Sequence, residues 1–328
     1  MIGNRGCILA LTLHALFPLC GFTQTLWREP PPATVSDFIW GPGGEQAAPR
    51  PPFRFLKEKL SGTNPKVDVL DATGRHWIVK FGSEVHADTF APRLLNALGY
   101  AAAPTYYVAD GSMQSVHDLK RAKHFISKDG SFRTARFKLH CSGAESDVEN
   151  VAWSWVSNPF MGSRELGGLK IMMMLTSNWD AKDSRDGPGE SNTGTIRSAA
   201  GPTSGVWYAV TDWGASFGRS GGYLRRDRWD WGAYRSQTPD FVRLAPDGHL
   251  IWGFKGKHVQ DITEGVGLDD VRWLLPYLSR ITDQDLEAGL EASGASPAVA
   301  RDFTRSIRQR IEQLQGIAQS STIRQAAK

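Results

Sequence analysis

Two short acidic stretches decide the fold of this chain, Asn178-Trp-Asp-Ala-Lys-Asp-Ser-Arg185 and Asp212-Trp-Gly214. The residues ahead of the first stretch, 169–175, are rich in Met and Leu, which predicts a buried helix. The residues ahead of the second stretch, 206–211, are β-branched and aromatic, which predicts a strand that ends at Asp212. We therefore expect two acids to stand at the ends of two buried elements.

Two acids and a nearby lysine in such positions are the groups that phosphoryl transfer requires. One carboxylate orients the attacking hydroxyl and accepts its proton, a second carboxylate holds Mg²⁺, and a cation offsets the charge on the transferred group. Asp180, Asp212 and Lys182 are the residues that we expect in these three roles.

The motifs Asp180-Ala-Lys182 and Asp212-Trp-Gly214 resemble the catalytic loop and the Asp-Phe-Gly motif of the protein-kinase-like fold. The stretch Asn178-Trp-Asp180 also resembles the atypical kinase groups, such as the HipA-type and phosphatidylinositol kinases, in which the loop reads Asn-x-Asp. The resemblance implies ATP and Mg²⁺ as cofactors and a hydroxyl acceptor on a protein, a sugar or a small molecule. It also implies a two-lobed α+β fold with a small antiparallel-sheet N-lobe and a mainly helical C-lobe.

Two features depart from the pattern of that family. Arg185 stands where the resemblance places a metal-binding asparagine, and Asp180 and Asp212 are farther apart than is usual. One insertion, at about residues 185–190, explains both departures, because its removal brings Asn192 into the expected position. The second metal ligand is therefore assigned to Asn192.

The segment before these motifs predicts a small sheet with a helix. We expect strands at 53–60, 66–70, 76–81 and 106–108, a turn at Asp110-Gly111, and a helix at 83–98 that stops at Gly99. A further strand is expected near 132–139, within a basic stretch whose charged residues are expected to form a solvated face. Helices at 267–278, from Thr282, and from Ser296-Pro297 to about 314 should pack the core near the C-terminus.

Lysines of the expected sheet are the candidates for contacts with the nucleotide. The resemblance implies that Lys80, at the end of its strand, contacts the α- and β-phosphates while a carboxylate holds its stem. Glu84 and Asp88 lie one helical turn apart, and Glu84 is favoured as that carboxylate because glutamate reaches farther. Lys66 closes the loop 61–66, which lies where a kinase-like fold covers the phosphates.

Length and composition favour a globular protein with a large core. The 328 residues are 41% hydrophobic and 22% charged, which excludes a disordered chain. The net charge of +4 is small, and no basic stripe with interleaved aromatic residues points to nucleic acid. The expected parts are a signal peptide at 1–23, an extended arm rich in Pro and Gly at 24–52, the N-lobe at 53–108, the C-lobe at 109–316 and a frayed tail at 317–328.

The first residues predict export. Arg5 precedes an apolar run at 7–21 that is too short to span a bilayer comfortably, which is typical of a secretory signal peptide. Leu19 is too bulky for a good lipobox, so we do not expect a lipid anchor on Cys20. After cleavage we expect a periplasmic or secreted protein without a membrane span, in which Cys141 is the only cysteine and no disulfide forms.

The sequence leaves three alternatives open. The first is a pseudokinase that binds a nucleotide or a partner without turnover. The second is an exported binding protein of the cell envelope, with aromatic surfaces for recognition. The third is a hydrolase that uses Asp180, Asp183 and Asp212 as general acid and base.

Overall fold

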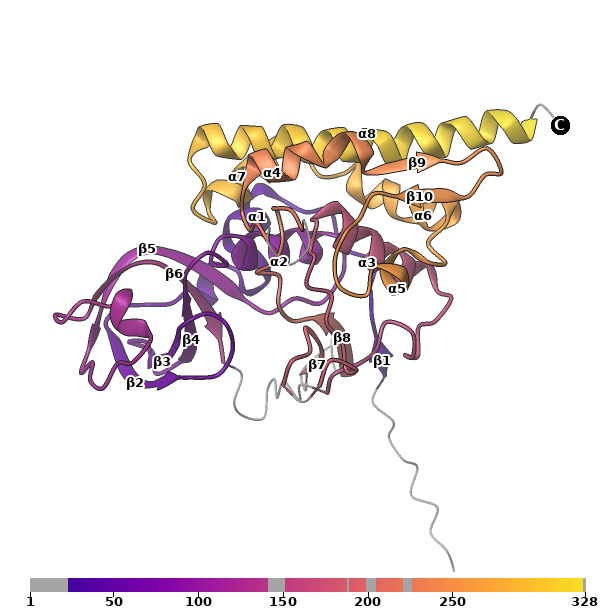
Figure 1. The fold of residues 1–328 in the computed structure, drawn as a ribbon. Helices are drawn as coiled ribbons and strands as arrows, with labels where there is room; N and C mark the ends of the chain where they lie inside the picture. Colours follow the sequence, from indigo (N-terminus) through magenta and orange to yellow (C-terminus); the bar gives the residue numbers. More distant parts are fainter. Residues whose placement is uncertain (1–22, 141–150, 188, 199–204, 221–225, 327–328) are drawn as a thin grey trace, which may run out of the picture.

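A computed structural model describes residues 23–140, 151–187, 189–198, 205–220 and 226–326. The expected signal peptide, with Cys20, lies outside the described residues, as does Cys141. The described chain is a mixed α+β structure with a sheet-rich N-terminal part and a mainly helical C-terminal part, which confirms the predicted fold class. Figure 1 shows the strands of the first part grouped at one end of the molecule, while the long C-terminal helix crosses above the rest.

The N-terminal part is built on a closed five-stranded barrel. Its strands are β2 (Phe53–Lys59), β3 (Lys66–Leu70), β4 (His76–Phe81), β5 (Thr105–Gln114) and β6 (Ser131–Leu139). Neighbours in the order β2-β3-β4-β6-β5 pair antiparallel, and the parallel pairing of β2 with β5 closes the barrel. Trp77, Val79 and Phe81 belong to the buried cluster inside it. Because side chains alternate along a strand, Lys80 points away from this interior.

Strand β5 corrects the turn that was expected at Asp110-Gly111. Both residues lie inside β5, opposite Arg133 and Phe132 of β6. A Cβ on Gly111 would stand 2.7 Å from the ring of Phe132. The glycine is therefore explained by the aromatic ring that packs over the strand, and a turn is not needed.

The expected extended arm is partly folded. It contains β1 (Gln24–Thr25), helix α1 (Val35–Trp40) and two 3₁₀ turns at Gly41–Gly43 and Glu45–Ala47. Thr34 and Asp37 form a capping box at the start of α1, which stabilises this short helix. Phe38 is fully buried in the main core, and the buried guanidinium of Arg93 donates hydrogen bonds to the carbonyls of Phe38 and Ile39.

Helices and two small sheets make up the rest of the described chain. The helices are α2 (Ala87–Ala97), α3 (Arg164–Leu175), α4 (Trp231–Ser236), α5 (Val259–Thr263), α6 (Leu268–Leu278), α7 (Asp283–Glu291) and α8 (Pro297–Ala326). Strands β7 (Thr193–Ser198) and β8 (Gly205–Val210) form a hairpin that β1 extends, and β9 (Val242–Leu244) pairs with β10 (Leu250–Trp252). Short 3₁₀ turns lie at Ala122–His124 and Thr238–Asp240.

The core explains where these helices lie. Helix α3 is the buried helix that the sequence predicted, because its residues from Leu166 to Leu175 are buried. Thr282 and Asp285 form the expected capping box of α7. Helix α8 continues to Ala326, beyond residue 317 where fraying was expected, and Ile317 packs into the same core. Among the described residues, we find no helix with the length and hydropathy needed to cross a membrane.

Candidate active site

The ammonium group of Lys80 lies among three carboxylates. Its Nζ atom is 3.0 Å from Oε2 of Glu84, 2.9 Å from Oδ2 of Asp88 and 3.1 Å from Oδ2 of Asp212. Burial alone would lower the pKa of Lys80, but the carboxylates of Asp212, Asp88 and Glu84 raise it above its usual value. The amine therefore stays charged although it is 2% exposed.

Two acids near the start of α2 hold the ammonium group of Lys80, whereas the sequence favoured Glu84 for this contact. Helix α2 begins at Ala87, so Glu84 lies in the turn before it and Asp88 in its first turn. Asp88 also accepts from Nη2 of Arg136 at 2.9 Å and from the backbone N–H of Trp213 at 3.1 Å. Burial would raise the pKa of Asp88, but Arg136 and Lys80 lower it below its usual value. Asp88 is therefore the more firmly held partner.

Asp180 and Asn192 meet through a side-chain hydrogen bond. The amide Nδ2 of Asn192 donates to the carbonyl of Asp180 at 2.6 Å and to its carboxylate Oδ2 at 3.2 Å. The Nζ atom of Lys182 is 3.5 Å from the same carboxylate oxygen and 3.2 Å from Oε2 of Glu190. Burial would lower the pKa of Lys182, but Asp180 and Glu190 raise it.

Backbone and amide hydrogen bonds join the Asp180 group to the Asp212 group. Nδ2 of Asn178 donates to the carbonyl of Asp212, and Oδ1 of Asn178 accepts from the N–H of Asp180, each at 3.4 Å. The N–H of Thr211 donates to the carbonyl of Asn192 at 2.7 Å. The structure therefore brings Lys80, Asp180, Asn192 and Asp212 into one connected network.

Glycine at position 214 is required by the close approach of the Asp212 segment to Glu84. The N–H of Gly214 donates to Oδ1 of Asp212 at 2.9 Å, which fixes the carboxylate relative to the turn. A Cβ on Gly214 would stand 2.7 Å from the side chain of Glu84. Any larger residue would push the segment that carries Asp212 away from Lys80 and Glu84.

Lys66 lies directly opposite Lys80 on the neighbouring strand β3. Burial and the positive charge of Lys80 lower its pKa. Within the described part of the chain, no carboxylate lies within ion-pair distance of its ammonium group. Lys66 is thus a partly buried cation beside Lys80 that has no acidic partner within the residues that the structure describes.

Two further cations, Arg136 and Lys138, lie near Lys80 and Asp212 and were not predicted from the sequence. Arg136 lies opposite Lys80 on β6 and is 4% exposed, and Lys138 donates from Nζ to the carbonyl of Thr211 at 3.0 Å. Burial and the nearby Arg136 lower the pKa of Lys138 to about 8. The available signal was their spacing of two in a strand, which places both side chains on one face. Arg136 is buried against Asp88 of α2, and Lys138 is partly buried against the segment that leads to Asp212.

Arg185 takes no part in this network. Its guanidinium pairs with Asp183 at 2.7 Å and with Asp261 of α5 at 2.6 Å. It therefore neither replaces a metal-binding asparagine nor lies against Asp212 or Lys80. Asn192 contacts Asp180 in its place, in the manner expected if residues near Arg185 are an insertion.

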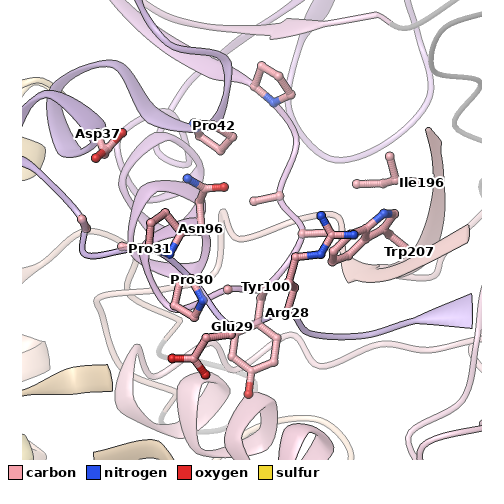
Figure 2. A pocket seen from close by; sticks show the side chains of 16 residues that line it. Arg28, Glu29, Pro30, Pro31, Asp37, Pro42, Asn96, Tyr100, Ile196 and Trp207 are labelled. Atoms are coloured by element: carbon pink, nitrogen blue, oxygen red, sulfur yellow. The ribbon is translucent and has the colours of Figure 1, made fainter. Parts of the chain in front are cut away.

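A separate cavity of about 550 Å³ lies at the other end of α2 (Figure 2). The arm, the segment after α2 and the hairpin β7–β8 line it, with the guanidinium of Arg28 5.1 Å from the ring centre of Trp207. None of the seven residues predicted for the site lines this cavity. The chemistry described above therefore belongs to the network around Lys80 and Asp180.

Comparisons with known proteins give little further guidance. No family model and no curated protein matches the chain. Two solved structures of the Golgi casein kinase are similar, one of them with Mn/ADP bound. Their TM-scores are 0.43 and 0.40, their identities are 12% and 11%, and the matches cover 83% of this chain and 73% and 72% of theirs.

Proposed function

We propose that the protein is a kinase-like phosphotransferase that moves the γ-phosphate of ATP to a hydroxyl acceptor with the help of Mg²⁺. The observation that carries this proposal is the 3.1 Å ion pair between Lys80 of β4 and Asp212, which follows β8. Asn178 connects the same Asp212 to Asp180. These contacts link Lys80, Asp212 and Asp180, to which we assign the phosphates, the metal ion and the hydroxyl acceptor.

Asp212 and Asn192 carry donor atoms of the type that a divalent metal ion takes. Carboxylate and amide oxygens are the ligands that Mg²⁺ accepts, and Asp212 is partly exposed. The Nδ2 group of Asn192 is used on Asp180, and among the described residues no hydrogen bond to Oδ1 of Asn192 is present. When bound, the metal would neutralise charge on the phosphates.

Lys80 and Lys66 would contact the phosphates. Both are cations of adjacent strands, and Lys66 lacks an acidic partner among the described residues. The lowered pKa of Lys66 reflects burial beside another positive charge. An anionic ligand would relieve this repulsion, which makes the pair a suitable phosphate contact.

Asp180 would orient the hydroxyl acceptor and accept its proton. The hydroxyl oxygen forms a bond to the γ-phosphorus while the bond to the oxygen that bridges the β- and γ-phosphates breaks, so that ADP leaves. Lys182, 3.5 Å from Asp180, would offset the charge on the group in transfer. The acceptor is proposed only as a hydroxyl compound, and the proposed export rests on the N-terminal sequence.

The geometry disfavours the hydrolase alternative. The carboxylate of Asp183 accepts hydrogen bonds from the N–H of Trp155 and from three groups of Arg185. Burial would raise the pKa of Asp183, but these hydrogen bonds lower it to about 2. Asp183 is therefore neither protonated near neutral pH nor free to take a proton, and a general acid–base role does not suit it.

Metal-dependent binding of ATP tests the proposed function. We expect ATP with MgCl₂, at about 100 times its Kd, to stabilise the wild-type protein by about 2.7 kcal/mol in thermal unfolding. The variant Asp212→Asn should lose the Mg²⁺-dependent part of this shift. Asp247→Asn is the matched control, because Asp247 is an exposed acid that pairs with His249. An Asp212→Asn protein that keeps the full shift would refute the metal assignment, and a wild-type protein that shows none would refute the function.

A further inference from the structure

The loop that carries Asp180 and Lys182 shows a regular alternation of burial. Trp179, Ala181 and Asp183 are 3%, 1% and 0% exposed, whereas the two residues between them are partly exposed. The N–H of Lys182 donates to the carbonyl of Asp180 at 2.8 Å, so the loop turns between these two residues while its neighbours stay buried. One side of this loop is therefore anchored in the protein, and the other side presents Asp180 and Lys182.

Each of the three anchored residues has its own hydrogen bond. The carbonyl of Trp179 accepts from the N–H of Lys257 at 2.8 Å, and the carbonyl of Ala181 accepts from Nε1 of Trp155 at 3.0 Å. The carboxylate of Asp183 accepts from the N–H of Trp155 at 2.8 Å. The position of Asp180 therefore depends on Trp155 on one side and on the segment before α5 on the other.

Arg185 joins these two supports. Its Nε and Nη2 atoms donate to the two oxygens of Asp183 at 2.9 and 2.7 Å, and Nη2 also lies 2.6 Å from Oδ2 of Asp261. Asp186 adds a second link, because its Oδ2 is 2.7 Å from Nε2 of His258, at the start of α5. A bidentate guanidinium has the fixed geometry that such a bridge needs.

The backbone of the partner segment is held in an unusual conformation. His258 has φ 49° and ψ 35°, in the left-handed region that residues other than glycine seldom adopt. Its ring nitrogens lie 2.7 Å from Asp186 and 3.2 Å from Asp261. A Cβ on Gly256 would stand 2.7 Å from the carbonyl of Trp179, so this segment packs directly on the loop.

Asp183, Asp186 and His258 have ligand atoms within 4.8 Å of one another, but this grouping does not call for a metal ion. Arg185 already neutralises Asp183, and Lys257, 3.4 Å from Oδ1, adds a positive charge beside Asp186. The cluster is therefore complete as a set of ion pairs between the loop and α5.

We propose that Arg185 is a positioning residue, which acts on the reaction by holding Asp180 and Lys182 in place through Asp183 and α5. This inference deepens the proposed function and rests on it for its kinetic part. In this proposal the apparent insertion, at about residues 185–190, supplies the residue that positions the loop. Arg185, which departs from the kinase pattern, would then support the loop with Asp180 and Lys182 from its buried side.

A comparison of Arg185→Gln with the wild type tests this role. We expect the kcat for phosphate transfer from ATP to fall about 10- to 100-fold, the cost of a small misplacement of a catalytic group. The Kd for ATP with MgCl₂ should not change, since Lys80 and Asp212 are untouched. Arg164→Gln is the matched control, because Arg164 also bridges two acids, Asp269 and Asp270, and should leave kcat unchanged.

The same substitution in the Asp180→Asn background separates positioning from general damage. If Arg185 acts through Asp180, Arg185→Gln should lower the residual rate by less than about twofold there, because effects of residues that act as a unit are not additive. A loss of the same size in both backgrounds, or no loss of kcat in the single variant, would overturn the inference.

If the wild type transfers no phosphate, the proposed function is refuted. Hydrogen exchange then still tests whether Arg185 holds the loop. The N–H groups of Asp183, Arg185 and Asp186 are hydrogen-bonded within the loop, to Asp186 Oδ2, to Asp183 Oδ1 and to the carbonyl of Asp183. These amides should exchange faster in Arg185→Gln, while those of β3 and β4 stay unchanged. Unchanged loop exchange in the variant would contradict the positioning role on its own.

Discussion

The substitution Asp180→Asn is expected to slow phosphate transfer from ATP by about 10² to 10⁴-fold, the contribution typical of a group that accepts a proton in the reaction. An amide keeps the shape of the carboxylate and its contact with Asn192, but it cannot take up the proton of the hydroxyl. The affinity for ATP with MgCl₂ should be retained, because Lys80 and Asp212 are unchanged. Single-turnover transfer of radiolabelled γ-phosphate, to the protein itself or to water, measures the rate.

The control for this variant is Asp269→Asn. Asp269 is an exposed acid of α6 that pairs with Arg164 and Arg272, away from the loop. We expect its transfer rate to equal that of the wild type. A wild-type rate in Asp180→Asn would exclude Asp180 as the proton acceptor, and a loss of ATP affinity would show that the residue acts mainly in binding.

The substitution Asp88→Ala is expected to destabilise the fold by about 3–5 kcal/mol, the usual cost of removing one partner from a buried ion pair. It would leave Arg136 without its acidic partner and deprive Lys80 of the most buried of its three carboxylates. It would also remove the acceptor of the Trp213 N–H. Unfolding in urea, monitored by tryptophan fluorescence, measures this loss.

Glu84→Ala is the matched comparison, and we expect it to lower the free energy of unfolding clearly less than Asp88→Ala does. Lys80 keeps Asp88 and Asp212 in that variant, and Arg228, the other partner of Glu84, is partly exposed. Because the pKa of Asp88 is lowered on folding, its contribution is complete above its ordinary pKa of about 4 and is lost as the pH falls further. The difference between wild type and Asp88→Ala should therefore shrink in acid. An equal or larger loss of stability in Glu84→Ala would contradict the conclusion that Asp88 is the more firmly held partner of Lys80.

Elements with a strong local pattern could be predicted from the sequence. The barrel strands β2, β3 and β4 and the buried helix α3 follow from alternating or continuous apolar residues that do not depend on distant contacts. The cap of α7 is equally local, because Thr282 and Asp285 satisfy each other's backbone. Each of these elements lies where the sequence predicted it.

Features set by tertiary contacts could not be predicted. Gly111 looks like a turn residue, but its place in β5 depends on the ring of Phe132 in another strand. Arg136 and Lys138 look like solvated charges, because only the closed barrel and the Asp212 segment show that they are covered. The folded part of the arm likewise depends on Arg93, which comes 55 residues after Phe38.

The candidate site lies between these two cases. Its residue types and their order were visible in the sequence, as was the offset of Asn192 from the usual position. The contact of Lys80 with both Glu84 and Asp88 could not be predicted from the sequence. It depends on the start of α2 at Ala87, which brings both carboxylates to the amine. The roles of these residues stay predictions until they are measured.

A crystal structure of the protein with a non-hydrolysable ATP analogue and MgCl₂ tests the phosphotransfer centre most directly. We predict phosphate oxygens within hydrogen-bond distance of Nζ of Lys80, a metal ion on Asp212 and Asn192, and the γ-phosphate nearest to Asp180. An analogue bound in the cavity beside Trp207, or elsewhere without contact to Lys80 and Asp212, would contradict the proposed function.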